Sequence, residues 1–381
     1  MKVDANVRPI APSTCLGGSS MGYEIDFLPV GDESSGGDAI ALRYGNLHGQ
    51  RSEQTVIVID GGYLDDGEAL VKHIEEYYQT SEIDIVVSTH PDQDHISGLR
   101  IVLERMQVGV LLMHLPWEHS ASMARAKALS FKTSTLSEKL RKTLQGAADL
   151  EEIARAQGVE IVEPFTGIET PDGAFRILGP TEDYYRSLLP EIIGESGWTQ
   201  KSAISLIESV RKLLSGLIPE TLHTETLRED GETSPKNNSS AVCLLTVDGH
   251  KSLFTGDAGI PALAQVLDML ENEGFQPGTL EFVQAPHHGS RRNVSPSILN
   301  RLLGQKGQQS KIGTSFVSTP RKNPDHKHPA KKVTNAFLRR GYPVHATQGT
   351  AKWHRHDAPN RSSYTTSTPI PLHEMVEEDG D

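Results

Sequence analysis

The segment from His90 to His95 places four potential metal ligands within six residues. Its sequence is His-Pro-Asp-Gln-Asp-His, and it follows the apolar run 83–87. Imidazole and carboxylate groups in combination suit zinc, manganese or iron, and no cysteine stands nearby to offer a thiolate. In an extended turn, side chains at alternate positions point the same way, so His90, Asp92 and Asp94 can face one site while His95 serves a neighbouring ion. The segment therefore predicts a metal centre.

Two other polar segments, each placed after an apolar run, offer further functional side chains. Asp257 follows its run by way of a glycine, and its two carboxylate oxygens can bridge two ions. A later loop contains Asn323, His326 and His328. Either histidine can bind metal, donate a proton to a leaving group or hold a substrate. We expect His328 to be catalytic, and Asn323 and His326 to bind substrate.

A pair of adjacent histidines, His287 and His288, follows the apolar run 280–284. Two neighbouring histidines cannot both face a core, so at least one is expected to face solvent or a ligand. Ser290 is a candidate helix N-cap. Arg291 and Arg292 follow directly, and we expect them to engage phosphate at that helix end.

The elements that must position these residues form a mixed α/β pattern. Two strands joined by turn glycines and a third strand predict an antiparallel meander at the start. The expected strands lie at 23–30, 39–43, 55–60, 83–87, 108–113, 159–162, 174–178, 241–247, 252–254, 280–284 and 315–318. The expected helices lie at 65–78, 98–106, 261–273, 295–303 and 329–340.

One large domain, 23–356, is expected to carry this pattern. Helix-forming residues at about 118–157 predict a first insertion, and the long stretch 181–236 predicts a second one that ends in a mobile loop. Residues 1–22 lack the basic start and apolar run of a secretory signal, and we expect a flexible arm there. The Ser/Thr/Pro-rich and then acidic residues 357–381 predict a disordered tail.

Charge is distributed unevenly along the 381 residues. The net charge is −13, yet the segment 281–356 contains fourteen Lys and Arg against two acids, a net of +12. Such asymmetry favours a surface that faces a polyanion on an otherwise acidic body. The alternative interpretation is a solvated basic face on helices.

Cysteine content and hydropathy narrow the class of protein. The two cysteines, Cys15 and Cys243, form neither a disulfide framework nor a thiolate metal site, so we expect a reducing, cytoplasmic setting. No apolar stretch approaches the roughly 18 residues that a membrane span needs, and we expect no membrane partner.

The ordered set of motifs resembles the metallo-β-lactamase superfamily. Within it, the set is similar to the branch typified by the C-terminal domain of the DNA-uptake channel protein of competent bacteria. The resemblance covers about 23–353 apart from the two insertions. The motifs that carry it are Asp26-Phe-Leu-Pro-Val-Gly31, Ile59-Asp-Gly-Gly62, Thr89-His-Pro-Asp-Gln-Asp-His95 with Gly98, Asn237-Asn-Ser-Ser240, Thr255-Gly-Asp-Ala258, His287-His-Gly-Ser290, and Asn323 with His328-Pro329.

This resemblance implies a four-layered αβ/βα sandwich and a site for two divalent metals, Zn²⁺ or Mn²⁺. His90 and Asp92 would hold one ion, Asp94 and His95 the other. Asp257 would bridge the two ions.

The resemblance also implies that His287 completes the ligand set of the second ion. Asp94 would orient a metal-activated water, and His288 or His328 would steady developing oxyanion charge.

Two departures from the superfamily pattern concern the first ion. Asp92 stands where a histidine is usual, and Asn238-Ser239 stands where another histidine is usual. These harder, weaker ligands favour manganese, or a single tightly held metal. We interpret Asn238 as a substrate-binding residue.

The resemblance and the basic segment together favour a metal-dependent phosphodiesterase or nuclease acting on DNA or another nucleotide polyanion. One alternative is a hydrolase of a small anionic ester, thioester or lactam, with Arg and Lys holding a carboxylate. Another is a non-catalytic regulatory module that binds a protein partner through the 181–236 insertion. Loss of activity in Asp94→Ala separates the enzymes from the regulatory module.

Overall fold

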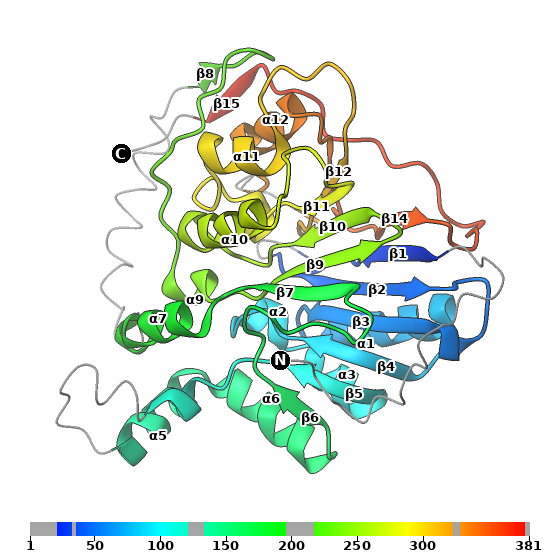
Figure 1. Ribbon diagram of the computed structural model, residues 1–381, viewed down its shortest axis with the longest axis vertical. Coiled ribbons are helices and arrows are strands. Elements are labelled where there is room, and N and C mark those ends of the chain that lie inside the picture. The colour runs from blue at the N-terminus through cyan, green and yellow to red at the C-terminus, as the bar shows by residue number, and fades with distance from the viewer. Residues whose placement is uncertain (1–20, 33–35, 121–132, 196–216, 323–327, 378–381) are drawn as a thin grey trace.

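A computed structural model describes residues 21–32, 36–120, 133–195, 217–322 and 328–377 (Figure 1). Its largest sheet has seven strands in the order β14-β1-β2-β3-β4-β5-β6. The strands β1, β2 and β3 pair antiparallel, as the predicted meander requires, and β3 to β6 pair in parallel. The bounds are β1 Gly22–Phe27, β2 Ala39–Gly45, β3 Gln54–Gly61, β4 Glu82–Val87, β5 Gln107–Leu112, β6 Glu160–Val162 and β14 Lys352–His356.

A second sheet of six strands has the order β13-β12-β11-β10-β9-β7. Its strands β10 to β13 are parallel, while β7 and β9 are antiparallel to their neighbours. The bounds are β7 Phe175–Gly179, β9 Val242–Val247, β10 His250–Phe254, β11 Phe282–Gln284, β12 Thr314–Val317 and β13 Val344–Ala346.

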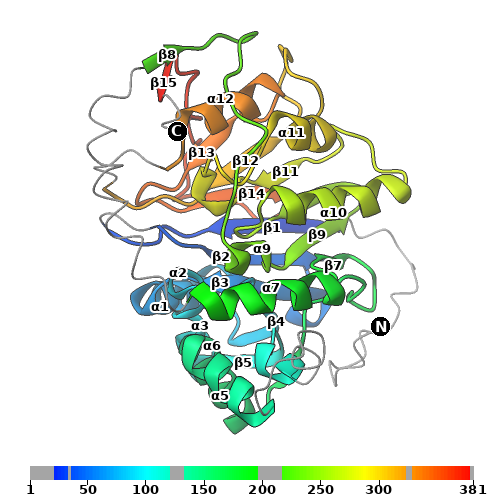
Figure 2. The ribbon, with the colours of Figure 1, turned by 90° about the vertical axis from the view of Figure 1, so that its left-hand side faces the viewer.

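Helices cover the outer face of each sheet, and Figure 2 shows the two sheets between the two helical layers. Parallel strands need a crossover connection, which these helices supply. On the first sheet lie α1 Leu64–His73, α3 Leu99–Arg105, α5 Thr133–Thr143 and α6 Gln145–Ala156; on the second lie α10 Ile260–Asn272, α11 Pro296–Leu303 and α12 Lys331–Arg339. The other helical segments are η1 Arg51–Glu53, α2 Gln93–Ile96, η3 Pro116–His119, α7 Glu182–Glu195, α9 Pro235–Asn238, η4 His287–Gly289 and the π-helical turn Ile74–Tyr78.

Three apolar cores hold these layers together. The central core fills the space between the sheets, with Phe27 and Ile57 from the first sheet against Phe254 and Phe282 from the second. The other two cores lie between each sheet and its helices. The four-layered α/β sandwich expected from the sequence is therefore confirmed.

The two segments expected as insertions differ in structure. In the first, η3, α5 and α6 are helical, and 121–132 lies outside the described residues. The second begins with α7 and, beyond the undescribed 196–216, continues as largely extended chain with the short strand β8, Leu217–Pro219, and the one-turn helix α9. Figures 1 and 2 place α7 and α9 side by side.

The expected disorder of the tail does not hold for 357–377. Residues 375–377 form β15, Met375–Glu377, which pairs with β8, and the Arg361 guanidinium binds the Asp26 and Glu24 carboxylates of β1. The polar composition of this segment predicted disorder. The segment is ordered because a few of its residues bind specific partners elsewhere in the chain, which composition does not reveal. In the part of the chain that the structure describes, no helix is long and apolar enough to cross a membrane.

Candidate metal centre

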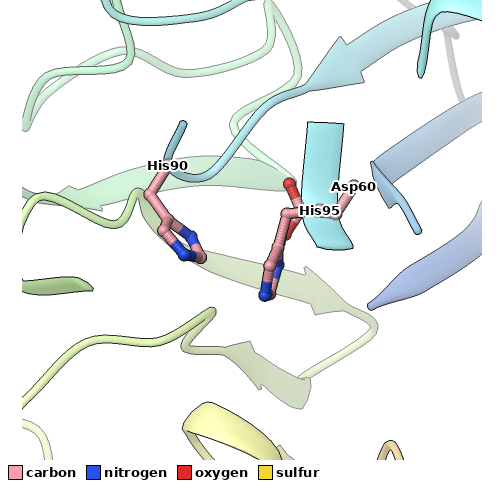
Figure 3. Close-up of side chains that lie close together, drawn as sticks. All are labelled: Asp60, His90 and His95. Atoms are coloured by element: carbon pink, nitrogen blue, oxygen red, sulfur yellow. The ribbon is translucent and has the colours of Figure 1, made fainter. Parts of the chain in front are cut away.

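The candidate site lies where strand ends from both sheets meet. Asp60 is in the last residues of β3, and His90 follows β4; Asp257 follows β10, and His287 follows β11. Since neighbouring parallel strands end at the same edge of a sheet, they present these side chains together. Figure 3 shows Asp60, His90 and His95 gathered at this edge.

His90 and His95 form the buried floor of the site. Their ring centroids are 4.2 Å apart, and both side chains are inaccessible to solvent. Nδ1 of His95 lies 2.8 Å from Asp60 Oδ2, and Nδ1 of His90 lies 3.1 Å from Thr89 Oγ1. Because each Nδ1 has a partner in the protein, each Nε2 is left to face the site.

The Asp257 carboxylate lies between two sets of ligands. Its Oδ1 is 3.5 Å from His95 Nε2, while its Oδ2 is 3.6 Å from His90 Nε2 and 3.5 Å from His287 Nε2. The resemblance implied that His287 would complete the ion on the His95 side. The structure places it beside the oxygen that faces His90, with its Nδ1 2.9 Å from Asn293 Oδ1.

Asp94 and His288 complete the set around His95. Asp94 Oδ2 lies 3.8 Å from His95 Nε2 and 3.7 Å from His288 Nε2. His287 and His288 both adopt left-handed backbone angles, with φ of 49° and 55°. Non-glycine residues rarely adopt this conformation, and here it turns two consecutive imidazoles into one site.

The donor set fits a divalent cation. Several buried atoms that converge here have no hydrogen-bond partner in the described part of the chain: His90 Nε2, His95 Nε2, His288 Nε2 and Asp257 Oδ1. Buried polar atoms are normally paired, because leaving them bare costs about 1–3 kcal/mol each. Ligand atoms of Asp94, His95 and His288 all lie within 4.8 Å of one another, and so do those of Asp38, His95 and Asp257.

The electrostatics also suit metal binding. Burial, reinforced by the nearby His95, holds the pKa of His90 well below its usual range, which keeps the imidazole neutral. Although burial opposes its ionisation, the proximity of His288 and the charge of His95 hold the pKa of Asp94 below its usual range. Neutral imidazole and ionised carboxylate are the forms that bind metals, so His90 and Asp94 are already in their binding forms. Although burial opposes protonation, neighbouring carboxylates outweigh it and raise the pKa of His95 and of His288, the latter to about 9, so an ion must displace a proton from each.

Asp60 orients His95 from behind. The Asp60 carboxylate accepts from the backbone N–H and the hydroxyl of Thr89, at 2.8 and 2.6 Å, and contacts His95 Nδ1. This fixes which ring nitrogen of His95 faces the site, as carboxylates do for metal-binding histidines. The motif Ile59-Asp-Gly-Gly62 was quoted for the resemblance, but Asp60 was not predicted as a site residue.

Replacing Asp60 by Asn is expected to weaken divalent metal binding by about 10- to 100-fold, because the amide no longer fixes the His95 tautomer. Isothermal titration of metal-free protein with Mn²⁺ measures the effect. Glu68→Gln, at an exposed ion pair with Arg105, is the matched control and should bind like wild type. An unchanged affinity in Asp60→Asn contradicts the positioning role.

Asp38 is a second buried acid that sequence reasoning missed. It accepts hydrogen bonds from Ser318 Oγ at 2.5 Å and Gln284 Nε2 at 2.8 Å, and lies 3.9 Å from His95 Nδ1. It therefore joins the ends of β11 and β12 to the histidine floor. A lone Asp after a glycine turn carries no signal of this role.

The loop that carries Asn238 is arranged differently from the prediction. Asn238 turns away from the site and bonds the backbone of Gly259 and Thr233. Its neighbour Asn237 instead donates to Asp257 Oδ2 at 3.2 Å. Lys236, also missed by sequence reasoning, donates to Asp92 Oδ1. The other Asp92 oxygen lies 3.7 Å from His90 Nε2.

The remaining predicted residues lie around the site. Ser290 is buried and is not a helix N-cap: it ends η4, and Ser295 is the N-cap of α11. Arg291 and Arg292 therefore lie in a turn and not at a helix N-terminus. The His328 ring stacks on His287 with centroids 5.9 Å apart. Asn323 and His326 lie outside the described residues.

Part of the basic segment serves the fold. Arg339 and Arg340 are fully buried and pair with Glu220 and Glu225 of the second insertion. Lys332 is also buried, and Arg301 pairs with two acids of α10. The +12 segment is thus neutralised in part by acids distant in sequence, which a count along the chain cannot detect. Among the described residues of this segment, Arg292, Arg321 and Lys322 are exposed.

Comparisons with known proteins agree with this architecture. The family description "Metallo-beta-lactamase superfamily" matches residues 50–302, more than half of the chain. A Thermotoga maritima protein provisionally named a metallo-beta-lactamase is similar in structure, with 12% identity over 66% of this chain and 92% of that chain. Its TM-score of 0.33 is too low to carry further argument. No curated protein matches the chain.

Proposed function

The chain belongs to the metallo-β-lactamase superfamily, and from that premise we propose that it is a divalent-metal-dependent phosphodiesterase acting on nucleic acid or another nucleotide. We also propose, from the motif residues alone, that the chain belongs to the branch of the superfamily that processes DNA. Zn²⁺ and Mn²⁺ are the candidate ions, and a cytoplasmic location remains a prediction.

The observation that carries the proposal is the position of Asp257. One oxygen faces His95 and the other faces His90 and His287, so this carboxylate could help to hold an ion on each side. Paired ions about 3.5–4 Å apart are typical of phosphatases and nucleases, and when bound they activate water and stabilise charge on phosphoryl oxygens. The remaining acids, Asp92 and Asp94, are hard ligands that suit Mn²⁺ as well as Zn²⁺.

Cationic side chains around the site support a phosphoryl substrate. The Lys236 ammonium reaches Asp92 at one side of the site. On another side, Pro320 and His288 both lie against Gly36, so the exposed Arg321 and Lys322 follow directly beside the histidines. These groups can hold non-bridging phosphate oxygens, and Asp94 can orient the attacking water through its carboxylate.

We expect purified protein with Mn²⁺ or Zn²⁺ to hydrolyse bis(p-nitrophenyl) phosphate and to degrade DNA or RNA. Asp94→Ala should lower the rate by at least about a thousandfold, because the variant loses both a ligand and the group that orients water. Binding of single- or double-stranded DNA should fall steeply with salt, as phosphate contacts require. Asp268→Ala, at an exposed acid of α10, is the control.

Other outcomes would replace the proposal. Turnover of a carboxylic ester, thioester or lactam, with no polyanion binding at low salt, would identify a small-substrate hydrolase. A chain that hydrolyses none of these substrates, and retains a protein partner in Asp94→Ala, would be a regulatory module. A cyclic dinucleotide in the substrate panel separates small nucleotides from polymeric nucleic acid.

A further inference from the structure

The helix α9 directs two hydrogen-bond donors into the metal centre. Ser234 caps this single turn: its Oγ accepts from Asn237 N at 3.1 Å and donates to Asn237 Oδ1 at 2.6 Å. With that oxygen engaged, the amide nitrogen of Asn237 points at Asp257 Oδ2. The preceding residue, Lys236, sends its ammonium to Asp92 Oδ1.

Both donors act on the same half of the centre. The carboxylate oxygens that face His90 are Asp257 Oδ2 and Asp92 Oδ2. Asn237 donates to Asp257 Oδ2, and Lys236 donates to the other oxygen of Asp92, Oδ1. An ion that binds beside His90 must therefore compete with a neutral amide and with a full positive charge for these carboxylates.

The half that contains His95 carries no comparable donor among the described residues. His95 Nε2, His288 Nε2 and Asp257 Oδ1 are all buried without a hydrogen-bond partner, and Asp94 lies within 3.8 Å of both histidines. The two halves thus offer similar atoms, but among the described residues only the His90 half has a lysine ammonium bound to one of its carboxylates. Lys236 is only about one-third exposed, so water screens its charge incompletely.

We propose that Lys236 makes the centre asymmetric: its ammonium holds Asp92, so the His95 side binds its ion tightly and the His90 side binds a second ion weakly. This inference rests on the metal-dependent function proposed above. It concerns ion binding and not turnover, so it can be decided whether or not the protein hydrolyses phosphodiesters.

Titration of the metal-free full chain with Mn²⁺ tests the assignment, with metal content measured after gel filtration as a second readout. Wild type should show one tight and one weak ion. Lys236→Met should lower the dissociation constant of the second ion at least about tenfold, since a unit charge next to a divalent ion is removed. Lys236→Arg retains the charge and should behave like wild type.

Lys72→Met, which removes an exposed lysine of α1, is the control for a general change in net charge. Thermal melting of each metal-free variant establishes that it is folded. The assignment is overturned if wild type binds two ions with equal affinity or binds none. It is also overturned if Lys236→Met leaves the second dissociation constant within about twofold of wild type while the protein remains folded.

Discussion

Asp257→Asn is expected to lower the affinity for the tightly bound ion by more than about a hundredfold, and to reduce phosphodiester hydrolysis by at least about a thousandfold. The carboxylate faces His95 with one oxygen and His90 and His287 with the other. An amide has a single oxygen, so the variant can serve one side at most. It also loses a negative charge among three histidines. No other single change should weaken the centre as much.

The stability of the same variant provides an internal check. Asp257 is nearly fully buried with Oδ1 unpartnered, and the substituted amide keeps one oxygen for the hydrogen bond from Asn237, so the change should cost the metal-free fold little. We expect the melting temperature of the metal-free variant to lie within a few degrees of wild type, while stabilisation by added Mn²⁺ is lost. Asp268→Asn, at an exposed acid, should retain both metal binding and activity. Full metal content in Asp257→Asn would exclude the bridging role.

The sequence could locate the candidate ligands because they are dense and local. His90 to His95 follows one strand within six residues, and the strand ends that carry Asp257 and His287 could be read from apolar runs. The apolar runs predicted the mixed α/β pattern, and the resemblance to the superfamily implied its four layers. Strongly periodic segments and clustered ligands are patterns that a single sequence contains in full.

The rest depended on contacts between distant segments. Asp38 reaches Ser318 and Gln284, which lie 280 and 246 residues further along the chain, and a lone acid in the sequence gives no hint of such partners. The choice between Asn237 and Asn238 depends on which side chain the Ser234 cap orients. The side of the centre that His287 faces likewise depends on its left-handed backbone, which no residue type requires.

The tail shows the same limit at a larger scale. The odd-numbered residues of β1, Tyr23, Ile25 and Phe27, face the apolar core between the sheets. The even-numbered Glu24 and Asp26 therefore point to the other face, where they are fully buried. Two buried acids on a strand require cations, and the one that lies farthest along the chain is Arg361.

Arg361→Met is accordingly expected to lower the free energy of unfolding by about 3–5 kcal/mol, since it removes the guanidinium that pairs with both buried carboxylates. The guanidinium binds both Asp26 oxygens, at 2.7 and 2.9 Å, and Glu24 Oε2 at 2.8 Å. Although burial favours the neutral acid, the charges of His73 and Arg361 hold the pKa of Asp26 below its usual range. Asp26 is thus ionised at neutral pH, and its stabilising effect is lost as the pH falls through that lowered pKa.

Urea denaturation of the metal-free protein measures this loss, and Arg105→Met provides the comparison. Arg105 pairs with Glu68 at 2.7 Å, as short a contact as that of Arg361, but both partners are more than 40% exposed. Exposed ion pairs contribute about 0–1 kcal/mol, so Arg105→Met should lower the free energy of unfolding much less than Arg361→Met, although the two contacts are equally short. If the two variants lose the same stability, the tail does not neutralise buried charge. If only Arg361→Met is destabilised, residues 357–377 are part of the folded domain, and their pairing of β15 with β8 positions the start of the segment that leads to Lys236.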